Sequence, residues 1–399
     1  MARRLAVLTT GRQDWGLLHP LCVELSSDDG FELLLIAGGM ACSESFGSVP
    51  EQIRADGFHP VRELAWPVVD TDPSIQMSRA LAETATAIQE LQPWALVLLG
   101  DRLETAAAAL AATLNRLPLV HLFGGEETQG AFDDCLRHAI TKLSHLHLVS
   151  HRVYARRVVQ LGENPDTVHV VGSLSLDNIL SQQLSSREEL EEHLGVRLEP
   201  PVGLVTLHPT TLADAREDEL AAVSGALEAC RATWVITLPN SDPGGAEIRR
   251  GFLALASKHE NIVAVPSLGA ARYLGLLRIA NVVVGNSSSG VTEAPLVGVP
   301  TVNIGDRQRG RIRFESVIDV PPNVDAIVQA IRRVFGSSVR VASDAPQKEM
   351  GDGRTAGRIR SILASWRAPD PPRKSFYDIP FDGVPDVQPV RRAQGRSEA

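Results

Sequence analysis

The sequence predicts an α/β protein made of two doubly wound domains that face each other across a cleft. Short apolar runs rich in Val, Leu and Ile recur along the chain without polar alternation. Such runs are typical of strands buried on both faces of a parallel sheet. Helix-length amphipathic segments separate them, and strand–helix–strand repetition builds a parallel sheet that carries helices on both sides.

The predicted strands fall into two sets along the chain. The first set comprises residues 5–8, 33–36, 96–99, 119–122 and 146–149. The second set comprises residues 202–207, 234–238, 262–265, 282–284 and 300–304. Several runs end in glycine or a polar residue. Open α/β sheets bind ligands at the carboxyl ends of their strands, so functional residues are expected there.

A break in this pattern separates the two sets of strands. Residues 185–201 predict a short charged helix and then a Pro-Pro turn, so we place the domain boundary there. The N-terminal domain then spans 1–185, and the C-terminal domain spans 186–367. Residues 368–399 are rich in proline and arginine and lack an apolar period, which predicts a mobile or surface-wrapping tail.

Charge and cysteine content exclude several classes of protein. The formal net charge of −9 argues against binding bulk nucleic acid or an anionic membrane surface. The four cysteines show no Cys-x-x-Cys spacing, which excludes a disulfide scaffold and a thiolate zinc site. No apolar stretch is long enough for a signal peptide or a membrane-spanning helix. The chain is therefore expected to be cytoplasmic.

Two short motifs of the first domain follow predicted strands. Arg12 lies where the first strand turns into a helix, and backbone N–H groups at such a turn favour a phosphate. The alternative is a tight turn with Arg12 in solvent. Asp101 and Arg102 follow residues 96–99, and Asp101 either points into the crevice or caps the next helix.

The densest polar cluster spans residues 121–150. Glu126 follows a Gly-Gly turn, and Asp133 and Asp134 begin an apolar-periodic helix. Helical spacing places Asp134 on the same side as Arg137 and His138, and the helix N-terminus stabilises carboxylates. This pattern favours a functional site, with a capped helix as the alternative. His145 and His147 are interpreted as structural, and no His/Asp spacing matches a metal motif.

The second domain carries a lone histidine and a serine-rich turn. His208 follows the first strand of this domain at its cleft-facing end. Ser287, Ser288, Ser289 and Gly290 end one strand and begin a helix, which brings hydroxyls, N–H groups and a positive dipole end together. We interpret this turn as a diphosphate cradle, with Glu293 for ribose hydroxyls and Arg307 for phosphates. A serine-rich N-cap is the alternative.

These motifs together are similar to one enzyme family. From residue 3 to residue 320 the chain resembles the hydrolysing UDP-N-acetylglucosamine 2-epimerases of sialic-acid and legionaminic-acid pathways. The motifs that carry the resemblance are TTGRQDWGLL, GDRLETAAA, GGEETQGAFDDCLRHAITKLSHLH, QLGENPDTVHVVGS, LPNSDPGG and GNSSSGVTEAPLVGVPTVNIGDRQRGR. The resemblance implies two Rossmann-like domains in the GT-B architecture, a UDP-sugar substrate, a homodimer or homotetramer, and no metal or nicotinamide cofactor.

The resemblance also implies a reaction. UDP leaves C1 while a base removes the C2 proton, and water then adds to the 2-acetamidoglycal with inversion at C2. The substrate would be UDP-GlcNAc or UDP-2,4-diacetamido-2,4,6-trideoxyhexose, and the product a free manno-configured sugar. The matching positions around the sugar are Asp101, Asp133, Asp134, Arg137 and His208. The matching positions around UDP are Arg12, Arg102, Asn240, Leu268, Ser287, Ser288, Ser289, Gly290, Glu293 and Arg307.

The chain departs from the family pattern at three positions. Phe123 stands where many relatives carry an acid or a histidine, Ala41 where many carry a histidine, and Asp134 where many carry a glutamate. Glu126 is the candidate to replace the missing acid, and Phe123 would form an apolar wall for a 6-deoxy sugar. A non-hydrolysing epimerase, a UDP-sugar hydrolase and a non-catalytic nucleotide-sugar-binding protein stay open as alternatives.

Overall fold

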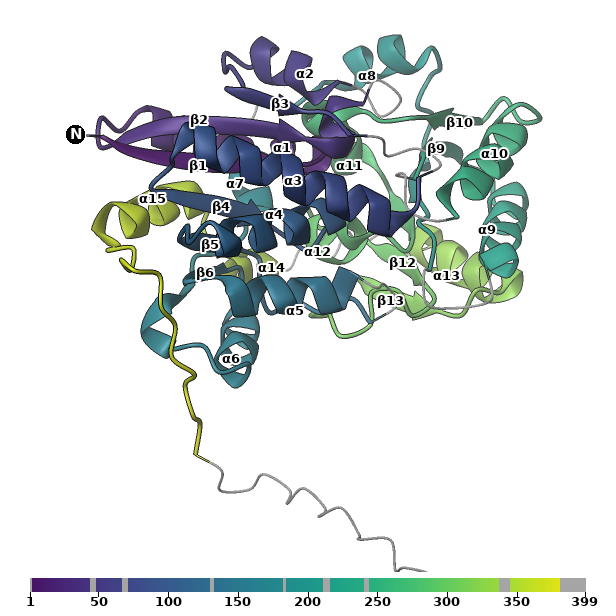
Figure 1. Ribbon diagram of the computed structural model, residues 1–399. Helices are drawn as coiled ribbons and strands as arrows, with labels where there is room; N and C mark the ends of the chain where they lie inside the picture. Colours follow the sequence, from purple (N-terminus) through teal and green to yellow (C-terminus); the bar gives the residue numbers. More distant parts are fainter. Residues whose placement is uncertain are drawn as a thin grey trace, which may run out of the picture.

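A computed structural model of the chain describes residues 2–43, 48–66, 71–129, 133–181, 184–210, 216–239, 244–336 and 345–380. Within these residues two parallel sheets form the core of the molecule, and helices cover both faces of each (Figure 1). This arrangement confirms the α/β class and the two doubly wound units that the apolar runs predict.

The first sheet consists of β1 (Arg3–Thr9), β2 (Phe31–Gly38), β3 (Arg62–Leu64), β4 (Ala95–Leu99), β5 (Leu119–Leu122), β6 (Leu146–Val149) and β7 (Val168–Val170). Their order across the sheet is β3-β2-β1-β4-β5-β6-β7, and all neighbours are parallel. The direction of winding therefore reverses between β1 and β4, and crevices for ligands form at such switch points.

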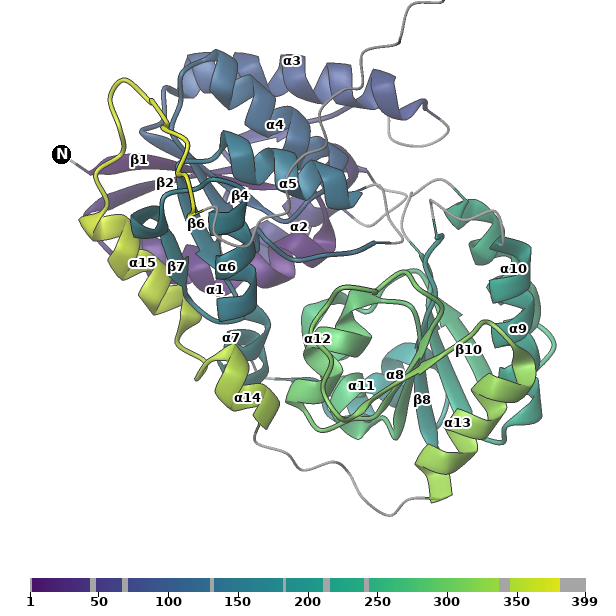
Figure 2. The same cartoon turned by 90° about the horizontal axis from the view of Figure 1, so that it is seen from below.

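The second sheet repeats this plan. It consists of β8 (Val202–Thr206), β9 (Thr233–Thr237), β10 (Ile262–Val265), β11 (Val282–Gly285), β12 (Thr301–Ile304) and β13 (Val317–Val320). The order is β10-β9-β8-β11-β12-β13, again with parallel neighbours. The winding reverses between β8 and β11. Figure 2 shows the two sheets with their helices side by side.

Helices α1 (Arg12–Ser26), α2 (Val49–Ala55) and α7 (Leu174–Ser181) contribute to the core on one face of the first sheet. The other face carries α3 (Pro73–Leu91), α4 (Leu103–Leu114) and α5 (Asp133–Leu143). Alternate residues of β1 belong to the two cores, Leu5 and Val7 to one and Ala6 and Leu8 to the other. Burial on both faces explains why this run lacks polar alternation.

The second sheet is covered in the same way. Its faces carry α9 (Arg216–Ala229), α10 (Gly245–Ala256) and α13 (Val324–Gly336) on one side, and α8 (Arg187–Leu194), α11 (Gly269–Ile279) and α12 (Ser288–Leu296) on the other. The remaining elements are η1 (Gly39–Cys42), α6 (Arg152–Gln160), η3 (Pro165–Thr167), α14 (Ala345–Met350) and α15 (Thr355–Ser365). Among the described residues, no helix combines the length and the hydropathy needed to cross a bilayer.

All the predicted strands are present, and β3, β7 and β13 are additional. Each of the three is a short strand at or near a sheet edge with mostly incomplete burial, so it lacks the continuous apolar run that marks a central strand. The predicted charged helix is α8, which Ser186 caps in a capping box with Glu189. We propose the domain boundary just before it, near residue 185, because Leu190 of α8 belongs to a core of the second sheet.

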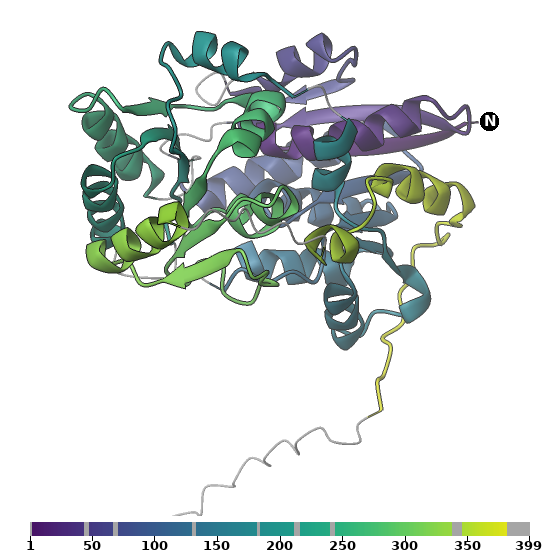
Figure 3. The ribbon, with the colours of Figure 1, turned by 180° about the vertical axis from the view of Figure 1, so that it is seen from behind.

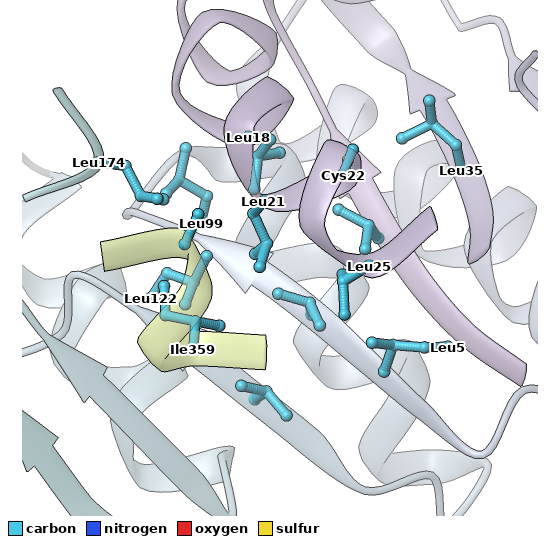
Figure 4. Close-up of a cluster of buried hydrophobic side chains, with 14 of the residues drawn as sticks. Leu5, Leu18, Leu21, Cys22, Leu25, Leu35, Leu99, Leu122, Leu174 and Ile359 are labelled. Carbon is cyan, nitrogen blue, oxygen red and sulfur yellow. The ribbon is translucent and has the colours of Figure 1, made fainter. Parts of the chain in front are cut away.

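The last helix differs from the sequence expectation. The sequence assigns residues 353–366 to the second domain, whereas α15 (Thr355–Ser365) packs on the first sheet beside α1 (Figure 3). Ile359 and Leu363 enter the same core as Leu18 and Leu21 of α1, and Figure 4 shows Ile359 beside Leu122. Its apolar face fits either sheet by periodicity, and only packing decides which one it covers.

The described part of the C-terminal tail lies against the first domain. Lys374 Nζ donates to the carbonyl of Lys142 at the end of α5 over 2.7 Å and lies 2.6 Å from a carboxylate oxygen of Glu163. The backbone N–H of Tyr377 donates to Gly162 over 2.9 Å. These contacts anchor residues 374–377 at the C-terminal ends of α5 and α6. Residues 381–399 of the expected tail lie outside the described residues.

Glu163 is only 2% exposed and depends on its cationic partners. Burial raises the pKa of this carboxyl, but hydrogen bonds from His147, Lys142 and Lys374 outweigh burial and bring the pKa down to about 2. A carboxyl with a depressed pKa stabilises the fold fully above its unfolded pKa of 4.5, and that contribution is lost as the pH falls toward 2.

We expect Lys374→Met to lower the free energy of unfolding at pH 7 by about 1–3 kcal/mol, because Glu163 loses one charged donor while buried. Urea unfolding at pH 7 and pH 3 measures the effect, and the difference from wild type should shrink at pH 3. The control is Arg373→Met, which changes the exposed neighbouring cation. Equal destabilisation by both variants would contradict the anchoring role.

Candidate active site

A cavity of about 370 Å³ lies between the two domains and is lined by residues of both. It opens at the carboxyl ends of β1 and β4 on one side and of β8 and β11 on the other, as expected for the two switch points. Most of the predicted site residues line it, namely Arg12, Asp101, Arg102, Glu126, Asp133, Arg137, His208, Leu268, Ser287, Ser288, Ser289, Glu293 and Arg307.

The buried guanidinium of Arg137 organises the first-domain wall. Its side chain is 3% exposed and pairs with Asp101, which follows β4, and with Asp134 at 3.4 Å. Burial lowers the pKa of Arg137, but Asp101, Glu126 and Asp134 outweigh burial and raise it. The cap of α4 is Arg102 and not Asp101. Asp101, whose side chain is 21% exposed, therefore faces the cavity while it pairs with the buried Arg137.

Asp134 plays a different part from its neighbour Asp133. Asp133 lines the cavity, whereas Asp134 does not. Asp134 Oδ1 accepts a 2.6 Å hydrogen bond from the backbone N–H of Thr128, and its other oxygen lies 3.6 Å from His138. The predicted grouping of Asp134, Arg137 and His138 on one side of the helix is confirmed. Asp134 holds Arg137 and the turn at Thr128 in place from behind the cavity.

His121 lies behind the residues that line the cavity, and the sequence motifs did not predict a role for it. Its Nε2 lies 2.8 Å from the carbonyl of Gly100, next to Asp101, and its Nδ1 lies 3.1 Å from Thr141 Oγ1 on α5. Burial lowers the pKa of His121 to about 3, so the ring is neutral at pH 7. It joins the strand end that carries Asp101 to the helix that carries Arg137. Gly124 is required beside it, since a Cβ there would lie 2.9 Å from Nδ1.

Phe123 and Ala41, two of the three departures from the family pattern, lie differently with respect to the cavity. Phe123 lines it and has a φ of +65°, a left-handed conformation that costs a bulky side chain about 1–2 kcal/mol. Ala41 is buried and does not line the cavity, whereas its neighbour Met40 does. Phe123 and Met40 add apolar surface to the cavity.

Glu126 returns to the cavity after the Gly-Gly turn, as the sequence suggests. Gly125 allows this turn with a φ of +76°, and a Cβ there would clash with the Tyr154 carbonyl. One carboxylate oxygen of Glu126 accepts from Ser150 over 3.1 Å, and the other pairs with Arg311 of the second domain at 2.5 Å. Both oxygens of Glu126 are therefore engaged.

His208 is buried at the end of β8, and its backbone is held by one amide side chain. Asn286 Oδ1 accepts from the N–H of His208 over 2.7 Å, and Asn286 Nδ2 donates to its carbonyl over 2.9 Å. Asn286 directly precedes Ser287. The histidine and the serine turn therefore keep a fixed relation across the β8–β11 switch point.

The Ser287 hydroxyl in the serine turn does not cap helix α12. Ser287 is the N-cap of α12 but makes no side-chain capping hydrogen bond, which argues against the serine-rich N-cap alternative. Ser287, Ser288 and Ser289 line the cavity, and Ser289 accepts from Tyr273 over 2.6 Å. Gly290 lies behind the turn, since a Cβ there would lie 2.8 Å from Thr301, and it does not line the cavity.

The opposite wall carries cations and a carboxylate at the start of α1. Arg12 is the first residue of α1, and its Nε is buried with no hydrogen-bond partner among the described residues. Asp14, which the sequence analysis passed over, also lines the cavity, and burial raises its pKa. Arg102 pairs with Glu104 at 3.3 Å. Asp14 lies in the first turn of α1, two residues after Arg12, and this position beside a predicted phosphate-binding residue could have drawn attention to it.

Other predicted residues lie at the edge of the site or outside it. Glu293 accepts from Ser175 of the first domain over 3.0 Å, and Leu268 precedes α11 at the cavity wall. Asn240 lies outside the described residues. His145 and His147 are structural as expected, because His145 accepts from the Leu119 N–H over 3.1 Å and His147 contacts Glu163 at 2.9 Å, away from the cavity.

The two parallel sheets, with a polar cavity between their switch points, define a protein of the GT-B-like class. The sequence profile of the UDP-N-acetylglucosamine 2-epimerase family matches residues 23–364. The chain therefore belongs to the UDP-N-acetylglucosamine 2-epimerase family and is an enzyme of the UDP-sugar 2-epimerase class.

Individual relatives agree with this membership. The chain is 35% identical over 323 residues to a Campylobacter jejuni protein named GDP/UDP-N,N'-diacetylbacillosamine 2-epimerase (hydrolyzing), covering 79% of this chain and 84% of that one. It is 32% identical over 388 residues to the Escherichia coli polysialic acid biosynthesis protein P7, covering 95% and 98%. The UDP-GlcNAc 2-epimerase of Neisseria meningitidis, solved with UDP-GlcNAc, shares the fold with a TM-score of 0.75 at 16% identity over 90% of this chain and 99% of that chain.

We expect Asp101→Asn to lower kcat by roughly 100-fold or more, because the amide keeps the size of the side chain but cannot accept a proton. UDP affinity should change little, since Asp101 is assigned to the sugar and the residues assigned to UDP are unchanged. Steady-state kinetics and calorimetry with UDP measure both. The matched control is Asp28→Asn, a similarly exposed aspartate that pairs with Arg360 outside the cavity. A near-wild-type kcat would contradict the assignment of Asp101 as a base.

The double variant Ser287→Ala with Ser288→Ala should weaken UDP binding by about 2–4 kcal/mol through the loss of two hydroxyl bonds to a diphosphate. Calorimetry with UDP measures the loss. The matched control removes two exposed hydroxyls that bond helix carbonyls, with Ser257→Ala and Ser365→Ala. Unchanged UDP affinity in the first double variant would place the nucleotide elsewhere.

Proposed function

We propose that the protein is a hydrolysing 2-epimerase of a UDP-HexNAc sugar, which releases UDP and a free manno-configured sugar. The observation that carries the proposal is the pairing of two unlike walls in one cavity. One wall holds carboxylates around a buried arginine, which suits proton transfer. The other holds serine hydroxyls at a helix N-terminus, which suits a diphosphate.

In the proposed first step, the bond between C1 and the UDP oxygen breaks and its electron pair leaves with UDP. A base, assigned to Asp101, takes the proton from C2, and the electrons of that C–H bond form the C1–C2 double bond of the 2-acetamidoglycal. The charge that develops on the diphosphate is stabilised by the serine turn, Arg12 and Arg307. Their positions along the same cavity support this assignment.

In the proposed second step, a protonated side chain delivers a proton to C2 from the opposite face while water adds its hydroxyl to C1, and the proton that this water releases restores the acid. Inversion at C2 requires an acid on a different side of the ring from the base. Asp133 and His208 also line the cavity and are the candidates for this role. Asp134 and Arg137 are assigned to positioning and charge balance, because Asp134 does not line the cavity and Arg137 is paired.

The substrate is proposed to be UDP-2,4-diacetamido-2,4,6-trideoxyhexose, with UDP-GlcNAc as the second candidate. Phe123 and Met40 give the cavity apolar surface that suits a methyl group at C6 better than a hydroxyl. Burying one methyl contributes about 0.8 kcal/mol. The names of the Campylobacter jejuni relative and of a Legionella pneumophila relative at 30% identity, both diacetylbacillosamine 2-epimerases, support the same choice.

The test is turnover of a panel of UDP- and GDP-linked HexNAc sugars, followed by NMR for both released nucleotide and free sugar. We expect equal amounts of UDP and free manno-configured sugar, with deuterium at C2 when the reaction runs in D₂O. An epimerised sugar still joined to UDP would identify a non-hydrolysing epimerase. Released UDP with a sugar of unchanged configuration would identify a hydrolase, and UDP binding without turnover would identify a binding protein.

A further inference from the structure

The loop of residues 305–313 follows β12 in the second domain, and one side of this loop contacts the rest of that domain. Arg307 Nη1 and Gln308 Nε2 both donate to the carbonyl of Asn286, over 3.1 and 2.9 Å. Asn286 in turn holds the backbone of His208 and directly precedes Ser287. The position of this loop is therefore tied to the proposed diphosphate cradle.

The other side of the same loop contacts the first domain. Arg311 Nη1 pairs with Glu126 Oε2 at 2.5 Å, and its Nη2 lies 3.4 Å from Thr128 Oγ1. The two ionic side chains are 9% and 10% exposed, so this is a nearly buried pair between domains. Gly310 lets the loop approach closely, because a Cβ there would lie 2.6 Å from Glu127 Oε2. The Arg311–Glu126 contact is called the cross-domain pair.

Thr128 continues the connection into the acid–base wall. Its hydroxyl accepts from Arg137 Nη2 over 3.2 Å, and its backbone N–H donates to Asp134 over 2.6 Å. Arg137 pairs with Asp101. One continuous set of contacts thus runs from the loop that carries Arg307, through Arg311 and Thr128, to the carboxylate proposed as the base.

We propose that Arg311 is a positioning residue that aligns the acid–base wall with the bound nucleotide, and that Glu126 serves as its partner rather than as a proton-transfer group. The proposal rests on the proposed function for the identity of the reaction. Both carboxylate oxygens of Glu126 are engaged, by Ser150 and by Arg311, which fits an anchor. Because Arg311 and Arg307 belong to one short loop, a diphosphate held by Arg307 fixes where Arg311 meets the first domain.

The kinetic experiment is a double-mutant cycle of Arg311→Met and Glu126→Gln. Each single variant should lower kcat by about 10- to 100-fold through misalignment, and the double variant should be no slower than the slower single one. KM and the Kd for UDP should change by less than about threefold, because the serine turn is intact. Arg311→Lys should recover part of kcat, since lysine keeps the charge without the forked geometry.

The control is Arg360→Met, which removes an arginine that pairs with two carboxylates and does not line the cavity. It should leave kcat unchanged. The proposal is overturned if the two losses multiply in the double variant, which would assign Glu126 an independent proton-transfer role. It is also overturned if the double variant regains wild-type kcat, because the loss would then come only from an unpaired buried charge.

A second readout does not depend on turnover. Amide hydrogen exchange should show that UDP protects residues 126–129 and the start of α5 in the wild type and in Arg360→Met, but not in Arg311→Met. If UDP binds but protection is the same in all three proteins, the positioning role is refuted while the proposed function stands. If the wild type turns over no UDP-sugar but shows this protection, the proposed function fails and the cross-domain connection is supported.

Discussion

The buried guanidinium of Arg137 imposes the constraint on which the candidate site depends. A charge with 3% exposure is tolerated only when opposite charges and hydrogen-bond acceptors surround it. Asp101, Asp134 and Thr128 supply them, and they come from the end of β4, the start of α5 and the turn after β5. The need to neutralise Arg137 therefore brings three separate segments together at the carboxyl end of the first sheet.

Helix α5 is held at both ends by charges that suit its dipole. Asp133 and Asp134 occupy its first turn, and Lys374 of the C-terminal segment donates to a carbonyl of its last turn. His121 adds a neutral contact from the adjacent strand through Thr141. Helix α5 is thus connected to β5, to the turn at Thr128 and to the C-terminal segment that contains Lys374. Residues far from the cavity contribute to its geometry through these contacts.

The two domains divide the chemistry between them. The first domain provides carboxylates and a strained aromatic residue, Phe123, whose left-handed backbone is of the kind that is retained at functional positions. The second provides hydroxyls, N–H groups and His208, all at strand ends of a second switch point. Neither set is complete without the other, so contacts between the domains, such as Arg311 with Glu126, belong to the site.

The sequence by itself determined the fold class, the central strands and most of the residues around the cavity. Strands buried on both faces must be continuously apolar, and ligand residues follow their carboxyl ends, so both leave local signals in the chain. The tertiary structure alone decided that α15 covers the first sheet, that Asp134 and Gly290 lie behind the cavity, and that Glu126 meets Arg311. These outcomes depend on which surfaces meet across the sheets and domains, and no short-range pattern encodes such pairings.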